Sequence, residues 1–268
     1  MPLIHACIAP HAGDLIDDSD KVTLTYQTMT EMGERLQALL PEVILIINPH
    51  GFRVQEALTI SVAEKAVADW SSEVKLDFEI DVELAHQIAD EASMFNVPVV
   101  RYIYGASGGD ACYIPLDWGA VVPLYFMGHR FTPKPKLVHC SPQRILSLAT
   151  HYEFGRAIGR VIRESNQRIA VIASADQGHA HDVNGPYGYD PASAKYDAWM
   201  QDVIHKGNLD ELLNADMQLV EDGKPDSLWP STILAGILKE NPMQAKFLSY
   251  EVNVYFGILC VEFLREST

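Results

Sequence analysis

The sequence has little positive charge and no long apolar run. Its 268 residues contain 20 Lys and Arg against 36 Asp and Glu, which gives a formal net charge of −16. Nucleic acids and anionic membranes bind basic surfaces, so we expect neither as a partner. No segment reaches the roughly 18 apolar residues that a membrane span requires, and the first residues show no basic segment followed by a long apolar one. We therefore expect a soluble, cytoplasmic protein.

Cysteine is scarce, and linker-like segments are absent from the sequence. The cysteines Cys7, Cys112, Cys140 and Cys260 are far apart and form no C-x-x-C pair. This spacing argues against a disulfide framework or a thiolate zinc site and fits reduced thiols. Hydrophobic residues make up 48% and charged residues 21%, which is typical of a globular chain. Without repeats or linkers to mark a boundary, we predict one domain over residues 1–268.

Short apolar runs alternate with longer helical patterns along the chain. The runs are nearly all apolar, which predicts strands buried on both faces. This alternation predicts an α/β fold, a single domain with a mostly parallel central sheet flanked by helices. The predicted strands are residues 3–9, 43–47, 98–103 and 169–173. The predicted helices are residues 20–40, 81–95 with Asp81 as N-cap, 141–163 opened by Ser141-Pro142, and a helix opened by Asp190-Pro191.

Three other segments have weaker patterns. Residues 54–80 fit either strand or helix, because an alternating stretch precedes one with helical character. Residues 208–246 are predicted to form a helical insertion. Residues 250–264 are the last apolar stretch, interrupted by Glu251 and Glu262.

Two histidines follow the first two predicted strands. His11 stands in Pro10-His11-Ala12-Gly13, and His50 stands in Asn48-Pro49-His50-Gly51. The carboxyl ends of parallel strands converge on one crevice, where open α/β folds bind their ligands. Proline before each histidine and glycine after it favour a tight turn that fixes the imidazole, as a metal ligand requires. We expect the two side chains to meet.

A third polar cluster follows the strand predicted at residues 169–173. It runs from Ser174 to Asp182 and contains His179 and His181. Two residues apart, these histidines would point the same way in extended backbone. They could form a metal pair or belong to a solvated loop.

Glu251 is a candidate for a carboxylate ligand. It precedes an apolar run from Val252 to Cys260, where an unpaired carboxylate is costly to bury. Its partner could be a metal, an arginine or a backbone N–H, and Asp176 and Asp182 are the next candidates for the ligand. Two imidazoles and one carboxylate form the facial triad that holds Fe(II). The cluster has no thiolate, which disfavours structural zinc but leaves catalytic zinc open.

These motifs resemble those of the class III extradiol ring-cleaving dioxygenases, the family that includes the β subunit of protocatechuate 4,5-dioxygenase. The motifs fall in the family's order over most of the chain and are Pro10–Gly13, Asn48–Gly51, Asp117–Leu124 and Ser174–His179. The resemblance implies Fe(2+) held by His11, His50 and a late glutamate, here Glu251. It also implies that His179 is the catalytic acid/base, with His181 as the second candidate. The implied substrates are a catechol-type aromatic and O2.

One position departs from the family pattern. Many members have Asp-His-Gly where this chain has Asp117-Trp118-Gly119, so a second active-site histidine is missing. Trp118 could stack on an aromatic ring, narrow the pocket, signal loss of the standard activity, or be a core aromatic of an amphipathic helix. His129, eleven residues further on, is a candidate replacement.

Two other functions share these ligands. A Memo-like protein of the same superfamily would bind metal or a partner without oxygenase activity, and a zinc hydrolase would use bound water as nucleophile. A homo-oligomer or a small accessory subunit, as some relatives require, is compatible with the sequence. Tyr187, Tyr189 and Arg130 lie in segments next to the motifs and are candidates to contact ring substituents.

Overall fold

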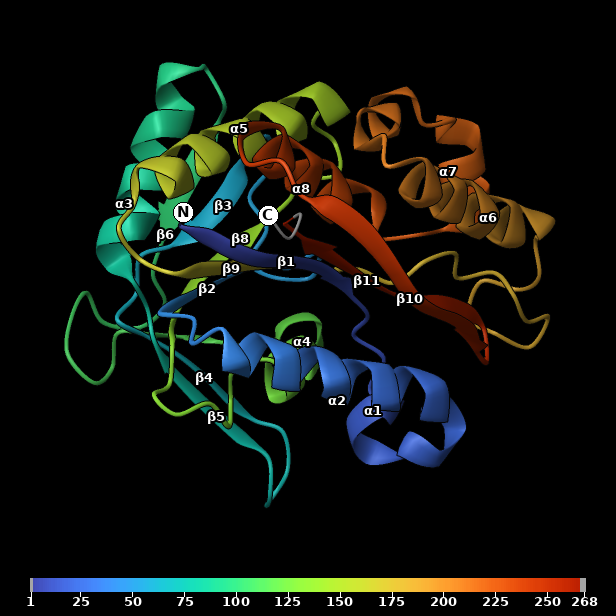
Figure 1. Cartoon of the computed structure of the whole chain (residues 1–268), viewed down its shortest axis with the longest axis horizontal. Coiled ribbons are helices and arrows are strands. Elements are labelled where there is room, and N and C mark those ends of the chain that lie inside the picture. The colour runs from blue at the N-terminus through green and yellow to red at the C-terminus, as the bar shows by residue number, and fades with distance from the viewer. Residues whose placement is uncertain (1, 266–268) are drawn as a thin grey trace.

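The computed structural model describes residues 2–265, and a sheet of eight strands runs through its centre (Figure 1). Its strand order is β10-β11-β1-β9-β2-β8-β3-β6. β1, β9, β2 and β8 are parallel neighbours, and every residue of β2 and β9 is buried. The predicted α/β class and mostly parallel sheet are therefore confirmed. These central strands are β1 (Leu3–Ala9), β9 (Ile169–Ser174), β2 (Val43–Ile47) and β8 (Lys136–Ser141).

Antiparallel pairs enclose this parallel centre. At one side β11 runs antiparallel to β1 and pairs with β10, so the last apolar stretch forms a hairpin. At the other side β3 runs antiparallel to β8, and β6 is parallel to β3. The bounds are β10 (Gln244–Asn253), β11 (Phe256–Leu264), β3 (Leu58–Ser61) and β6 (Val99–Tyr102).

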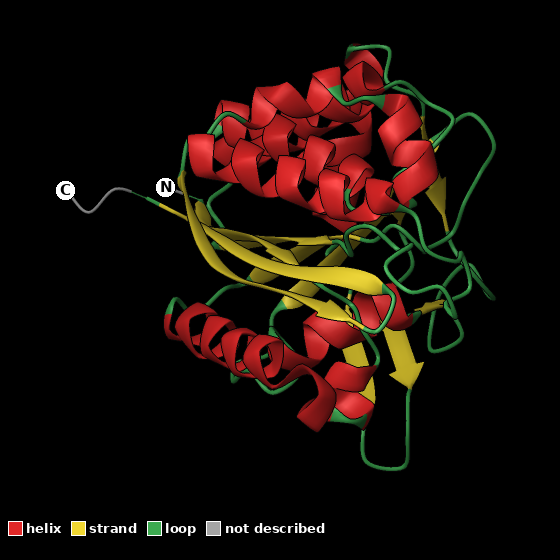
Figure 2. Ribbon diagram, turned by 90° about the vertical axis from the view of Figure 1, so that its right-hand side faces the viewer, coloured by secondary structure: helices red, strands yellow, loops and turns green. Residues whose placement is uncertain are grey.

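Helices cover both faces of the sheet (Figure 2). One buried cluster joins the sheet to α3, α5, α6 and α8, and another joins the opposite face to α2 and α4. The first face carries α3 (Val82–Met94), α5 (Leu148–Glu164), α6 (Pro191–Lys206), α7 (Met217–Gly223) and α8 (Leu228–Glu240). The second carries α1 (Asp14–Asp17), α2 (Thr23–Ala38) and α4 (Trp118–Phe126). The 3-10 helices Ser19–Val22 and Leu209–Asn214 complete the helical segments, and none of the helices described is long and apolar enough to cross a membrane.

The ambiguous segment 54–80 is extended. Besides β3 it contains β4 (Lys65–Asp69) and β5 (Lys75–Glu79), which form a three-stranded sheet with β7 (Tyr113–Pro115). In β5 the buried residues alternate with exposed ones, as in a strand with one face on a core.

Three of the expected helix starts can be compared with the structure. Asp81 caps α3 by accepting from the backbone of Leu84, and Asp190 caps α6 by accepting from Ala192. The start at Ser141 is wrong, because Ser141 ends β8, where it is buried and pairs with Thr59 of β3. The helix begins at Leu148 instead, where Ser147 Oγ accepts from Thr150 N at 3.1 Å.

Candidate metal centre

The parallel strands bring His11 and His50 together. His11 follows β1 and His50 follows β2, while β9 lies between these two strands in the sheet. The Nε2 atoms of the two imidazoles lie 3.1 Å apart, and the rings meet edge to face. Both side chains are sheltered from solvent, with exposed fractions of 2% and 19%.

Asp226, in the turn between α7 and α8, supplies the carboxylate of the cluster. Its Oδ2 lies 3.1 Å from Nε2 of His11 and 3.1 Å from Nε2 of His50. The three atoms thus form a triangle with sides of 3.1 Å. Ligand atoms that each lie about 2.1 Å from one ion are about 3.0 Å apart along the edge of an octahedral face. The triangle therefore has the dimensions of a three-ligand metal site.

The proton on His11 is placed on the side away from this triangle. The Ser174 hydroxyl donates to the carbonyl of Gly119 at 2.5 Å, so its oxygen accepts from Nδ1 of His11 at 2.9 Å. A neutral His11 then carries its lone pair on Nε2, which faces Asp226 and His50. A cation between them would satisfy all three groups, as in metal-bound histidines oriented through their other ring nitrogen.

The electrostatics of the cluster favour positive charge. Burial lowers the pKa of His11, but the carboxylates of Asp176 and Asp226 outweigh it and raise that pKa to about 9. Burial likewise raises the pKa of Asp226. The charge of His11 and its hydrogen bond outweigh burial and hold this pKa well below its usual value. Asp176 accepts from the backbone of His11 at 3.0 Å, and its own N–H donates to Asp226 at 2.8 Å. Two carboxylates fixed in this way attract a proton or a metal cation.

His50 is held by a chain of polar side chains. Its backbone N–H donates to Oδ1 of Asn48 at 3.0 Å. The amide of Asn48 donates to Asp117 at 2.9 Å and contacts Nε2 of His139 at 3.1 Å. Burial lowers the pKa of His139 to about 4, so this imidazole is neutral and Nε2 accepts from the amide. The turn after β2 is therefore fixed by side chains on two other elements.

Trp118 lies against His50 at the start of α4. The ring centroids are 4.5 Å apart, and Trp118 is 48% exposed. Of the roles left open by the sequence, a core aromatic is excluded. Trp118 forms a wall beside the candidate ligand.

A cavity of about 340 Å³ opens onto the cluster. His50 and Asp226 contribute to its lining, together with His179, Tyr187, Arg144 and Trp229. Cavities of about 300–1,000 Å³ are typical of small-molecule sites. A small ligand here would lie beside His50, Asp226 and His179.

His179 is positioned by packing and leaves its imidazole available. Its ring is stacked on Phe256 with a centroid distance of 5.3 Å, and Tyr187 meets it edge-on at 6.1 Å. Its backbone N–H donates to Gly223 at 2.8 Å. Within residues 2–265 the buried Nδ1 of His179 has no hydrogen-bond partner. The ring is therefore held in one orientation, while its Nδ1 atom makes no hydrogen bond in the described structure.

Glu251, which was expected to be the third ligand, does not lie in the cluster of His11, His50 and Asp226. It lies in β10, and its carboxylate accepts from the backbone N–H of Thr25 at 2.8 Å and from the Thr25 hydroxyl. The backbone N–H that the sequence left open is thus one of its partners. Asp226 takes the place expected for Glu251 beside the histidines.

His181 is engaged elsewhere and does not form a metal pair with His179. Its Nε2 lies 2.8 Å from Asp197, a buried carboxylate that also accepts from the Tyr250 hydroxyl at 2.6 Å. This contact joins the loop after β9 to α6.

The other residues singled out in the sequence are dispersed. His129 and Arg130 lie past the end of α4, where both contact the ring of Tyr125. Asp182 accepts from the backbone of Asn184 in a turn. Tyr187 lines the cavity, whereas Tyr189 bridges to the backbone of His181.

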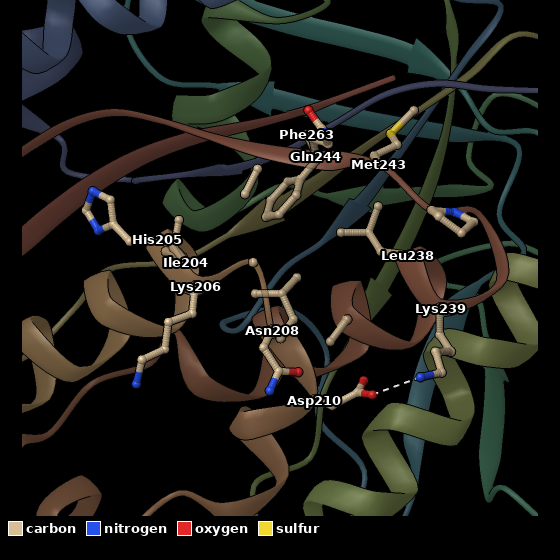
Figure 3. Close-up of a pocket in the computed structure, with 15 residues that line it drawn as sticks. Ile204, His205, Lys206, Asn208, Asp210, Leu238, Lys239, Met243, Gln244 and Phe263 are labelled. Carbon is tan, nitrogen blue, oxygen red and sulfur yellow. Dashed lines mark hydrogen bonds and ion pairs between the residues drawn. The ribbon is translucent and has the colours of Figure 1, made fainter. Parts of the chain in front are cut away.

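A larger cavity, of about 530 Å³, lies between the end of α6, α8 and the start of β10 (Figure 3). Lys239 and Asp210 form an ion pair of 2.9 Å at its edge. Nδ1 of His205 donates to the Gln201 carbonyl at 2.7 Å, and the ring stacks on Phe247. The cluster of His11, His50 and Asp226 does not line it. The volume of a cavity therefore does not identify the one that lies beside the candidate metal ligands.

An open sheet that gathers two histidines and a carboxylate beside a cavity defines an α/β protein with a candidate non-haem metal centre. The chain belongs to the family described as the catalytic LigB subunit of aromatic ring-opening dioxygenase, whose sequence model matches residues 7–258. The resemblance to class III extradiol dioxygenases is thereby confirmed.

Several relatives are similar over much of the chain. It is 25% identical over 257 residues to Protein CA_C1420 of Clostridium acetobutylicum, covering 94% of this chain and 54% of that protein. It is 25% identical over 209 residues to MEMO1 family protein TK1477 of Thermococcus kodakarensis, covering 72% and 58%. A 2,3-dihydroxyphenylpropionate/2,3-dihydroxicinnamic acid 1,2-dioxygenase of Photorhabdus laumondii is 20% identical over 161 residues, covering 57% and 48%. The chain spans about half the length of these relatives.

A solved structure has the same fold. The uncharacterized protein JW3007 from Escherichia coli K12 superposes with a TM-score of 0.65 at 16% sequence identity. The match covers 97% of this chain and 99% of that one.

Proposed function

We propose that the protein is a metal-dependent dioxygenase that performs extradiol ring cleavage of a catechol-type aromatic. His11, His50 and Asp226 hold Fe(II), and His179 is the acid/base. The observation that carries this proposal is the triangle of ligand atoms 3.1 Å apart, with an unengaged imidazole in the same cavity. Membership of a family of ring-opening dioxygenases supports it.

Different side chains have different roles in the proposed reaction. When bound, Fe(II) supplies coordination positions for both reactants and a route for electrons between them. His179 accepts a proton from a ring hydroxyl and returns a proton later in the reaction. Ser174 and Asn48 hold the two ligand histidines in orientation, and Phe256 holds the plane of His179.

Trp118 reduces the number of side chains that could transfer protons in the proposed reaction. Many members of the family have a histidine at this position, whereas here an indole covers His50. A second proton carrier is absent from that position, so acid/base work rests on His179. The indole instead offers an aromatic face to a ring in the cavity.

The test combines metal analysis with oxygen uptake. Protein purified without oxygen should contain one iron per chain and consume oxygen in the presence of at least one catechol. The product should absorb as a ring-opened semialdehyde. Iron retention without oxygen uptake on a broad catechol panel would contradict the proposed activity.

A Memo-like protein without oxygenase activity is the second candidate. Two observations favour it: the loss of the family histidine at Trp118, and the 25% identity to MEMO1 family protein TK1477. Such a protein would retain the metal and consume no oxygen. Stable zinc in place of iron would favour the third candidate, a zinc hydrolase with the same ligands.

A further inference from the structure

A further cavity, of about 320 Å³, lies between the turn after β2, the end of β6 and the start of α4. Among the described residues it shares no lining side chain with the cavity beside the metal cluster, and His11, His50 and Asp226 do not line it. Its wall consists mainly of aromatic and aliphatic side chains, and its volume is in the range typical of small-molecule sites. The fold therefore offers a candidate ligand site apart from the metal ligands.

Asp117 gives this cavity a negative charge. Among the described lining residues it carries the only formal charge, because burial lowers the pKa of His139 to about 4 and keeps that imidazole neutral. Asp117 is the N-cap residue of α4, yet its side chain makes no capping hydrogen bond. Its Oδ1 accepts from the Asn48 amide at 2.9 Å, and within residues 2–265 the carboxylate forms no ion pair. The carboxylate thus neither caps its own helix, the common role of aspartate at this position, nor meets a cation.

Three aromatic rings line the same cavity, those of Phe52, Tyr102 and Tyr104. Phe52 stacks on Tyr102 with a centroid distance of 4.7 Å, and Nδ1 of the neutral His139 donates to the Tyr102 hydroxyl at 3.1 Å. Phe52 and Tyr104 are 51% and 57% exposed, so their rings are open to a ligand. The faces of aromatic rings carry partial negative charge and attract cations. The rings and the carboxylate therefore favour the same sign of charge in a ligand.

We infer that this cavity binds a small organic molecule with a methylated ammonium group, such as a trimethylammonium ion. An unmethylated ammonium has three N–H donors that need acceptors, and a wall of mainly apolar side chains offers few. A trimethylammonium group has no donor and packs its methyl groups against aromatic faces. One carboxylate, that of Asp117, balances its single positive charge. The inference concerns a site apart from the metal cluster and does not depend on the proposed function.

The test compares two ligands of the same shape that differ in charge. Choline carries a trimethylammonium group, and 3,3-dimethyl-1-butanol has an uncharged carbon in place of the nitrogen. Titration calorimetry would measure the binding of each to the protein, with and without one equivalent of Zn²⁺. Choline should bind at least about tenfold more tightly than the alcohol, as expected for several cation–π contacts beside a carboxylate.

Two variants locate the cation within the cavity. Asp117→Asn keeps the size of the side chain and an oxygen that can accept from Asn48, and it removes the charge. In this variant choline should weaken to the level of the alcohol, while the alcohol is unchanged. Tyr104→Leu keeps an exposed apolar side chain and removes one ring. It should weaken choline by about two- to fivefold, the contribution of one cation–π contact at an exposed site, and change the alcohol less.

The control is Asp216→Asn, which replaces the N-cap aspartate of α7 outside the cavity. It should leave the preference for choline intact. Equal affinities of choline and the alcohol for the parent protein, or a preference that survives in Asp117→Asn, would overturn the inference. A preference that disappears when Zn²⁺ is added would place the cation at His11, His50 and Asp226 and would overturn it as well.

Discussion

Asp226 closes the triangle with the two imidazoles, so its charge sets how strongly the site attracts a cation. Asp226→Asn keeps the size of the side chain and removes the negative charge that would balance a divalent metal. We expect metal affinity to fall by more than about 100-fold, since loss of groups that only support ligands already costs about 10–100-fold. Elemental analysis after dialysis against a chelator would measure this.

Glu251→Gln is the matched control for Asp226→Asn. Glu251 contacts Thr25 and not the histidines, so this variant should retain the metal of the parent protein. Loss of metal in Glu251→Gln with full retention in Asp226→Asn would restore the ligand set expected from the sequence.

His179 is expected to carry acid/base chemistry without binding the metal. His179→Ala should retain iron and catechol binding, visible as a substrate-induced spectral change. Ring opening should slow by about 10²–10⁴-fold, the contribution of a positioned acid/base. If His179→Ala instead loses iron, the residue is a ligand and the triangle is incomplete.

His181→Ala tests the neighbouring histidine by stability and not by rate. Its removal leaves the buried Asp197 with one partner fewer. Unmet polar groups of this kind cost about 1–3 kcal/mol, which urea unfolding would measure. Turnover under conditions where the variant is folded should stay close to that of the parent.

At the scale of elements, the helix after β8 gives a prediction with an internal control. Ser147 caps α5, and Ser147→Ala should lower the free energy of unfolding by about 0.5–2 kcal/mol. Ser141, the start expected from the sequence, has a buried hydroxyl without a hydrogen-bond partner in the described structure. Ser141→Ala should therefore leave the free energy of unfolding unchanged or raise it. Thermal or urea unfolding of the two variants would decide between the two helix starts.

The strands at residues 3–9 and 43–47 were predictable because their runs are nearly all apolar, with His5 as the one polar side chain, as burial on both faces favours. The strand at residues 136–141 was missed, since His139 interrupts its apolar run and Ser141-Pro142 is also a common helix start. Pairing with β2, distant in sequence, makes it a strand.

The candidate site was likewise predictable only in part from the sequence. His11 and His50 carry a local signal, a proline–histidine turn after a strand. Asp226 carries none, because it stands in a turn before α8, where an acidic residue is ordinary. Only the packing of α8 against the sheet brings it to the histidines, and this packing is not encoded by nearby residues.

At the scale of the whole molecule, a bound metal would link three distant parts of the chain. Since the site exists in the folded state, Fe(II) should raise the unfolding temperature of the parent protein. With free metal at 100 times its dissociation constant, the gain is about 2.7 kcal/mol for a single site. Calorimetry without oxygen should show the shift in the parent and none in the double variant His11→Ala, His50→Ala. An equal shift in both would place the metal elsewhere.

The place of β9 between β1 and β2 has a consequence for biosynthesis. His11 and His50 are synthesised well before residues 169–174, which form the strand that lies between β1 and β2 in the sheet. Asp226 emerges later still. Until residue 226 is made, the nascent chain thus holds the two candidate ligand imidazoles without the third candidate ligand or the complete sheet that aligns them. Productive metal loading therefore belongs to the finished domain, after these long-range contacts have formed.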